Sequence, residues 1–435
     1  MLSSTFSFLI GFGCGLTVIK YHHIAKPKSW YDCLNDTFIM KTIILIFFII
    51  FLGHSSFGQT ESVYYKAPFD TSLSSKYLNK NCKITVILPK GYSKLNSTKM
   101  PLIIVFDRQN KMIFRQIYES INYLVSFSQI PESIIIGVSI DDNERNNETS
   151  LSISRRNGKG ELTNDFVFNE LIPYAEKELN VSNCRALIGH SRFGYLTSYM
   201  LIKNLNNLSA VISCSPLFTD TNVNLIDSLK DKMKSNTLNH KLYFRFITGD
   251  SIVDTKDYSL MKDFLSKTKA VKNFDWKGFE FYDAKHNTTP GLGVMPSLFE
   301  IFSYYSNEAN RLLTQDKLEF NRNDYDAFLN KMKNHYGAGI SLGLSVLNGI
   351  GFKYYNNKKY REARAVWDIL IQEYPLFSDT YSNIAKSYSK EGNKAYAIKF
   401  YELAKQKVMD NPFYSVDERL EDLKDIERKL LELSN

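Results

Sequence analysis

Ser191 lies in a segment whose residue types could supply a nucleophile. The segment reads Gly189-His190-Ser191, with an apolar run (186–188) before it and a helix-like stretch (196–203) after it. A strand that enters Gly-x-Ser and leaves as a helix is typical of a nucleophile elbow, where the serine sits in a sharp turn and its hydroxyl projects above the sheet. The N-terminus of the following helix can stabilise an oxyanion. The sequence therefore predicts an activated serine at position 191.

An acid and a base follow Ser191 in the order that such chemistry requires. Asp250 ends one apolar run, Asp254 lies just beyond it, and His286 follows the next apolar run. Because the carboxyl ends of parallel strands meet at one edge of a sheet, these side chains can come together. His286 would then take the proton of Ser191. Asp250, or alternatively Asp254, would orient the imidazole.

The residues after the serine depart from the Gly-x-Ser-x-Gly motif, because Phe193 stands where glycine is expected and Gly194 comes one place later. Gly-x-Ser is common by itself, and a histidine before a helix often serves only as a cap. The ordered set of serine, acid and histidine favours catalysis over this structural interpretation. The alternative is a hydrolase fold without activity that works as a binding module.

Short apolar, β-branched runs separated by amphipathic segments must position these residues. Runs of this kind are typical of central strands in a mostly parallel sheet with crossover helices, so the predicted fold class is α/β. One intervening helical segment, 165–179, contains Pro173, which predicts a kink. The runs are 84–88, 102–106, 134–138, 186–188, 210–214, 242–248 and 278–282.

The region after about residue 306 loses these runs and repeats itself. Four residue pairs share one offset, which for Ala363 and Ala397 is 397 − 363 = 34. The other three pairs are Gly351/Ala385, Tyr354/Tyr388 and Trp367/Tyr401. This offset is the period of tetratricopeptide repeats, about 34 residues, so residues 344–410 resemble a pair of them. We expect a helical linker over 306–343, a C-terminal helix over 411–435, and possible binding of a partner protein through the repeats; a plain helical extension is the alternative.

The N-terminal part of the chain carries a targeting pattern. Met40 opens a segment with a basic start, a short apolar run and a small-residue exit, so residues 40–58 are typical of a secretory signal peptide. Residues 1–39 contain another apolar stretch, which we interpret as an incorrectly assigned start or, alternatively, as a membrane segment. Both interpretations place the body of the protein outside the cytosol, in the periplasm or secreted.

Composition excludes several classes of function. A content of 44% hydrophobic and 23% charged residues is ordinary for a globular protein, and the 435 residues exceed what a single core usually holds. The net charge of +8 is spread along the chain without a dense basic run, which argues against a nucleic-acid partner. No Cys/His spacing indicates a metal site, and no cofactor is expected. Cys184 and Cys214 lie in apolar runs and are predicted to be buried.

The chain also resembles the putative esterase family, which includes enterochelin-esterase-like proteins and feruloyl or acetyl-xylan esterases. The resemblance covers roughly residues 65–305 and implies an α/β-hydrolase domain over 60–305. It further implies hydrolysis of a carboxylic ester through an acyl-enzyme, with a siderophore-linked or polysaccharide-linked ester as the substrate class. The segments that carry it are 83–92, 101–107, 170–174, 188–191 and 286–290.

The same resemblance nominates further residues around the serine. Ser191 and His286 match the family's nucleophile and base. The oxyanion hole would use the backbone N–H of Arg192 and that of Arg108, where the sequence reads Asp-Arg-Gln and the family often has Asp-Gly. Arginines in the polar stretch after the third predicted strand could grip an anionic or phenolic substrate or could lie in a solvated loop; they are Arg145, Arg155 and Arg156.

Overall fold

A computed structural model describes residues 64–97, 99–235, 237–250, 252–314, 320–411 and 414–434, apart from the side chains of residues 235 and 252–254. Residues 61–435 form one compact unit. The predicted signal peptide (40–58) and the segment before it (1–39) lie outside the described residues. Within the described ranges, no helix combines the length and the apolar character needed to cross a bilayer.

The centre of the fold is an eight-stranded sheet in the order β1-β2-β4-β3-β5-β6-β9-β10. All neighbours from β4 to β10 run parallel, whereas β2 is antiparallel to both β1 and β4. The predicted α/β-hydrolase sheet is therefore confirmed. The strands are β1 (Phe69–Ser75), β2 (Lys80–Ile87), β3 (Met100–Phe106), β4 (Ile134–Val138), β5 (Val181–His190), β6 (Ala210–Cys214), β9 (Leu242–Thr248) and β10 (Phe274–Glu280), with β7 (Thr219–Asp220) paired separately to β8 (Val223–Asn224).

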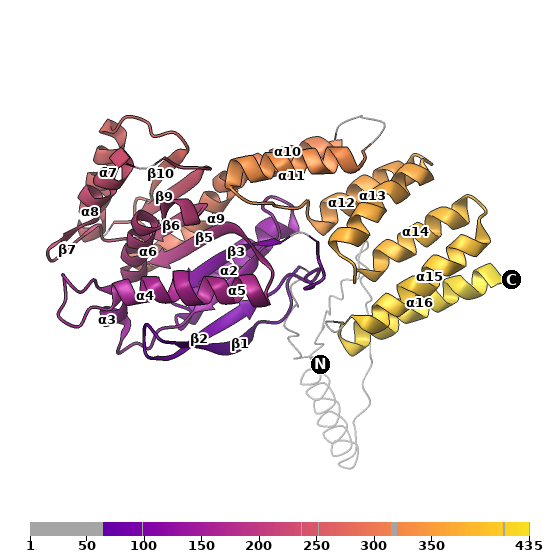
Figure 1. The fold of residues 1–435 in the computed structure, drawn as a ribbon, viewed down its shortest axis with the longest axis horizontal. Coiled ribbons are helices and arrows are strands. Elements are labelled where there is room, and N and C mark those ends of the chain that lie inside the picture. The colour runs from indigo at the N-terminus through magenta and orange to yellow at the C-terminus, as the bar shows by residue number, and fades with distance from the viewer. Residues whose placement is uncertain are drawn as a thin grey trace, which may run out of the picture. The chain divides into compact units, whose positions relative to one another are not determined.

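Helices cover both faces of this sheet (Figure 1). Helix α2 packs beside α9, and α6 packs on β5 and β6. Helix α2 turns an apolar stripe to the core, with Ile113, Ile117 and Ile121 buried at helical spacing. The helices of this part are α2 (Lys111–Ser126), α3 (Arg145–Thr149), α4 (Gly160–Phe166), α5 (Ile172–Glu178), α6 (Arg192–Lys203), α7 (Leu225–Ser235), α8 (Ile252–Lys267) and α9 (Thr289–Ile301), with short turns η1 (Val167–Leu171), η2 (Leu205–Asn207) and η3 (His286–Thr288).

The break expected near Pro173 takes the form of a π-helical turn. Helix α4 runs into the π-helix η1, and Pro173 lies in the first turn of α5 that follows. Because proline has no backbone N–H, the regular i→i−4 ladder cannot continue through it, and a wider turn absorbs the mismatch. The sequence thus located the irregularity, whereas its π-helical form emerged from the structure.

The two cysteines predicted to be buried are confirmed as buried thiols. Cys184 lies on β5 and Cys214 at the end of β6, and both are free of disulfides. Burial raises the pKa of Cys184 to about 12 and that of Cys214 in the same direction. Both thiols therefore stay protonated and pack as small apolar side chains.

After α9 every element in the described part of the chain is a helix. Helices α12 and α14 begin 378 − 344 = 34 residues apart, and so do α13 and α15, at 394 − 360 = 34. The repeated unit seen in the sequence is thus a helical hairpin, and its assignment to tetratricopeptide repeats stays a prediction. The helices are α10 (Ser303–Thr314), α11 (Arg322–Tyr336), α12 (Leu344–Asn356), α13 (Tyr360–Glu373), α14 (Ser378–Lys390), α15 (Lys394–Asp410) and α16 (Val416–Ser434).

Close backbone approach holds the first hairpin together. A Cβ atom on Gly351 would lie 2.2 Å from Nε1 of Trp367, so the indole lies directly against the α12 backbone. Trp367 is fully buried, and its Nε1 donates to Oδ1 of Asn348 at 3.1 Å. A buried indole with its N–H satisfied gives a large apolar contact without loss of a hydrogen bond. The glycine is therefore required by the tryptophan that faces it.

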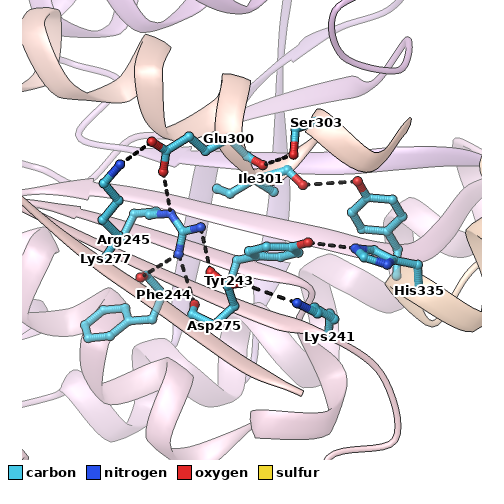
Figure 2. Close-up of polar contacts among 11 residues, drawn as sticks. Lys241, Tyr243, Phe244, Arg245, Asp275, Lys277, Glu300, Ile301, Ser303 and His335 are labelled. Atoms are coloured by element: carbon cyan, nitrogen blue, oxygen red, sulfur yellow. Dashed lines mark hydrogen bonds and ion pairs between the residues drawn. The ribbon is translucent and has the colours of Figure 1, made fainter. Parts of the chain in front are cut away.

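Figure 2 shows how the sheet is joined to the linker helices through aromatic residues. The hydroxyl of Tyr243 on β9 lies 2.7 Å from Nε2 of His335 on α11, and the His335 ring stacks on Tyr304 with centroids 4.0 Å apart. Desolvation lowers the pKa of His335 to about 4, so the ring is neutral at pH 7 and can accept a hydrogen bond from the Tyr243 hydroxyl. Tyr336 donates to the carbonyl of Ile301 at 3.1 Å. These contacts fix α11 on the end of α9.

An ionic network completes the same junction (Figure 2). The buried Arg245 donates to Oδ1 of Asp275 at 2.8 Å, and Asp275 also pairs with Lys241 at 3.4 Å. Glu300, at the end of α9, pairs with Lys277 and lies 3.7 Å from Arg245. Because a buried guanidinium is costly unless it is paired, Arg245 ties β9 both to β10 and to α9.

A second junction is formed by Glu132, in the segment before β4. Its carboxylate accepts from the backbone N–H of Leu344, the first residue of α12, at 3.0 Å. A negative charge at a helix N-terminus is favourable. Desolvation is nevertheless the largest influence and raises the pKa of Glu132 from 4.5 to about 7. The folded protein therefore binds a proton here at a pH where the unfolded chain has lost it.

The substitution Glu132→Gln is expected to make the protein more stable at pH 8 than the wild type. Because the pKa of Glu132 is raised in the folded state, its ionisation lowers the free energy of unfolding as pH rises from about 4.5 to about 7. The loss is on the order of 3 kcal/mol. Glutamine keeps an acceptor for Leu344 and cannot ionise. The urea midpoint at pH 5 and pH 8 measures the effect, with Glu418→Gln as the control, whose pKa is lowered. An equal difference from wild type at both pH values would contradict the assignment.

Candidate active site

Ser191 connects β5 directly to α6 in a strained conformation. Strand β5 ends at His190 and α6 begins at Arg192, so one residue must reverse the chain, and it does so at φ 58° and ψ −122°. Such a backbone costs about 1–3 kcal/mol and persists only where its surroundings enforce it. The N–H of Ser191 donates to the carbonyl of Cys214 at 2.8 Å, and its own carbonyl accepts from Tyr195 at 3.1 Å. This is the elbow geometry that the sequence predicts.

Two glycines permit this turn. A Cβ atom at Gly189 would lie 2.3 Å from the carbonyl oxygen of Phe193, because the first turn of α6 folds back onto β5. A Cβ atom at Gly194 would lie 2.9 Å from the carbonyl oxygen of Cys214 on β6. The second glycine is thus required where α6 passes the neighbouring strand, which explains its position three residues after the serine.

Phe193, the residue that departs from the motif, belongs to the core. Its side chain is fully buried, and its ring stacks on Phe106 with centroids 5.7 Å apart and planes 18° apart. The aromatic side chain therefore fills the space between α6 and the end of β3. The ring therefore packs into the core, and the activity of Ser191 stays a prediction.

His286 contacts His190, the residue before Ser191. Its ring centroid lies 4.8 Å from that of His190, and its carbonyl oxygen lies 2.9 Å from Nε2 of His190. Because a carbonyl only accepts, Nε2 of His190 carries the proton. The hydroxyl of Thr289 donates to the same carbonyl at 3.0 Å. Sequence analysis missed both anchors, although a histidine beside the nucleophile in Gly-His-Ser could have signalled the first.

The end of β9 touches the loop that carries His286. The backbone N–H of Asp250 donates to the carbonyl of Ala284 at 2.8 Å, and a Cβ atom at Gly249 would lie 2.3 Å from that oxygen. The side chain of Asp250 is exposed. Asp254 lies in the first turn of α8, and its side chain is outside the described residues. The structure thus brings both candidate acids to the edge that holds His286, and the choice between them stays a prediction.

The two predicted oxyanion donors differ in their backbone contacts. Arg192 is the first residue of α6, where backbone N–H groups point out of the helix end. The N–H of Arg108 instead donates to the carbonyl of Val138 at 3.1 Å and so extends the pairing of β3 with β4. Asp107 precedes it at φ 64°. Arg108 thus stands where the family often has glycine, and its amide is engaged in the sheet. The next amide along this turn is that of Gln109.

The arginines near the serine are mostly held by protein groups. The guanidinium of Arg192 donates to Thr149 at 3.3 Å and to Ser150, and Arg145 donates to Asp107. Arg155 and Arg156 are exposed. The structure therefore gives Arg145 a structural contact and leaves the two other arginines facing solvent. Arg155 also donates to the side chain of Asn147 at 3.1 Å.

Comparison with known families fits this site. Residues 75–256 match the family described as "Putative esterase". This part of the chain is therefore similar to an esterase family. The match includes Ser191 and both candidate acids and ends before His286. The family match therefore gives no support for His286 as the base. Its support comes from its position after β10 and from its contacts with His190.

Solved structures share the fold of the esterase domain. An IroE-like serine hydrolase from Shewanella oneidensis is similar at a TM-score of 0.54 and 15% identity, over 70% of this chain and 99% of that one. An uncharacterised protein from Capnocytophaga ochracea is similar at a TM-score of 0.52 and 16% identity, over 85% of this chain and 99% of its own. The similarity to the Capnocytophaga protein covers more of this chain than residues 60–305, so it extends into the C-terminal helices. No curated protein sequence matches this chain.

Proposed function

We propose that the protein hydrolyses carboxylic esters with Ser191 as nucleophile and His286 as base. The observation that carries the proposal is the strained turn at Ser191, which joins the carboxyl end of β5 to the N-terminus of α6. His190 ties the loop of His286 to that same turn. A serine in a strained strand-to-helix turn, with a histidine as its base, is typical of an activated nucleophile.

The proposed reaction follows the acyl-enzyme route. Oγ of Ser191 attacks the ester carbonyl while His286 takes its proton, and the C–O bond to the alcohol breaks as His286 returns that proton to the leaving oxygen. Water then attacks the acyl-enzyme by the reverse sequence and releases the acid. The oxyanion of each tetrahedral intermediate would accept from the amides of Arg192 and Gln109, since the amide of Arg108 is engaged with Val138.

Export, substrate and partner are further parts of the proposal and rest on the sequence. The pattern of residues 40–58 supports export to the periplasm or the medium. The family resemblance supports an ester linked to a siderophore or to a polysaccharide as substrate. The helical hairpins would position a partner protein, because stacked hairpins offer an extended binding surface.

A fluorophosphonate probe tests the proposal directly. The purified wild-type protein is expected to be labelled, because the probe phosphonylates activated serines, and His286→Ala is expected to slow labelling by about 10³-fold or more. Lys285→Ala, which changes the exposed neighbour, serves as the control. A folded wild-type protein that is not labelled would instead support the binding module without activity.

A further inference from the structure

We propose that Arg145 is a positioning residue that holds the two halves of the oxyanion hole in register. One half is the turn after β3, from Asp107 to Gln109, and the other is the first turn of α6. The two halves are far apart in the sequence and follow the ends of the neighbouring parallel strands β3 and β5, beyond the last paired residues Val105 and Ile188. The inference rests on the proposed ester hydrolysis and assigns no contact with substrate to Arg145.

Arg145 holds the first half through the carboxylate of Asp107. Its Nη2 donates to Oδ2 at 3.1 Å and its Nε to Oδ1 at 3.3 Å, a two-point contact. Asp107 is 5% exposed and has φ 64°, so its turn is both buried and strained. Nε2 of Gln109 donates to the same carboxylate at 2.7 Å, and Oε1 of Gln109 accepts from the N–H of Ile140 at 3.1 Å. Gln109, the oxyanion donor proposed for this turn, is therefore fixed through its own side chain.

Arg145 holds the second half through an aromatic ring. Its guanidinium lies over the ring of Phe193, 5.2 Å from the centroid, and that ring stacks on Phe106 at the end of β3. A guanidinium over an aromatic face is attracted by the ring quadrupole. Phe193 follows Arg192, the other proposed oxyanion donor. One side chain thus contacts both turns.

The short helix α3 reinforces the link. Arg145 begins this helix and Thr149 ends it, and Thr149 donates to the carbonyl of Arg145 at 2.6 Å. Thr149 and Ser150 in turn accept from the guanidinium of Arg192. Helix α3 is therefore bound to the β3 turn at its first residue and to the residue after the nucleophile at its end.

This linkage gives the ring of Phe193 a role that glycine could not fill. With glycine at position 193, the guanidinium of Arg145 would lose its contact with the first turn of α6, and the bonds of Arg192 to Thr149 and Ser150 would remain. Lysine cannot replace Arg145 fully, because an ammonium group offers neither the planar two-point contact with Asp107 nor stacking on the ring.

The test compares Arg145→Lys and Arg145→Met with Arg361→Met in the full-length protein. Arg361 is an exposed arginine on α13 and provides a matched control. Hydrolysis of p-nitrophenyl acetate and the rate of fluorophosphonate labelling are measured. Because small misplacements of oxyanion donors cost one to two orders of magnitude, Arg145→Met is expected to lower kcat and the labelling rate about 10- to 100-fold with KM within about twofold. The kcat of Arg145→Lys is expected to fall between those of Arg145→Met and the wild type, and that of Arg361→Met is expected to match the wild type.

Three outcomes would overturn the inference. The first is Arg145→Met with wild-type kcat. The second is a rise in KM with kcat unchanged, which would mean that Arg145 binds substrate. The third is a loss of kcat that Arg145→Lys shares in full while both proteins also melt well below wild type, which would mean that the residue only supports the fold. Failure of the ester-hydrolysis proposal is distinguishable, because the wild-type protein would then show neither labelling nor turnover.

Discussion

Ser191→Ala is expected to abolish fluorophosphonate labelling and to lower kcat for ester hydrolysis by about 10³-fold or more. Removing the nucleophile of a serine hydrolase commonly costs three to six orders of magnitude, and only residual catalysis from the oxyanion hole and substrate binding remains. The hydroxyl makes no capping bond to α6 within the described part of the chain, so its loss removes no helix cap. The melting temperature is therefore expected to stay within a few degrees of wild type.

Two variants make this expectation specific to the elbow. Ser152→Ala changes an exposed serine in the loop after α3 and is expected to label like wild type. Ser191→Cys keeps a nucleophile in the same turn and is expected to react with thiol-directed reagents faster than the buried Cys214 does. Retained labelling in folded Ser191→Ala would show that another serine reacts with the probe and would end the assignment.

The second large effect is expected at the acid of the triad. One of Asp250→Asn and Asp254→Asn is expected to lower kcat by about 10²- to 10⁴-fold with little change in KM, because asparagine leaves His286 in the wrong tautomer. The other substitution is expected to change kcat by less than about threefold. The contact of the Asp250 amide with the loop of His286 favours Asp250. The exposed side chain of Asp250 argues against Asp250 and so favours Asp254, since a triad acid is usually buried.

Steady-state kinetics with p-nitrophenyl acetate separates the two acids. Asp283→Asn, an exposed aspartate on the same loop as His286, is the matched control and is expected to behave like wild type. If both Asp250→Asn and Asp254→Asn retain wild-type kcat, the histidine has no carboxylate partner at this edge, and the triad as proposed fails.

Local patterns in the sequence determined the class of fold and the position of the turn at Ser191. Apolar β-branched runs specified the central strands because strands covered on both faces cannot alternate with polar residues. A glycine two places before Ser191 marked the turn because no other residue fits against the α6 backbone. The shared offset between Ala363 and Ala397 located the repeated hairpins, since packing of equivalent helices requires small residues at equivalent positions. Each of these signals depends on neighbours close in sequence.

The strand β1 escaped prediction for a related reason. Only Phe69 and Leu73 are apolar in this strand, which lies at the edge of the sheet, where only one neighbour pairs with it and most of its side chains are not buried. An edge strand of this kind needs no continuous apolar run and so resembles a loop in the sequence.

Only the tertiary structure decided how the site is assembled. The engagement of the Arg108 amide with Val138 depends on strand register, and the contact of His190 with His286 joins residues 96 positions apart. The position of Arg145 between Asp107 and Phe193 depends on the packing of three segments, which are the turn after β3, helix α3 and the start of α6. Side-chain contacts of this kind follow from the packing of distant segments, and no local spacing encodes them. The sequence by itself therefore determined which residues could do the chemistry, and the fold determined which groups hold them in place.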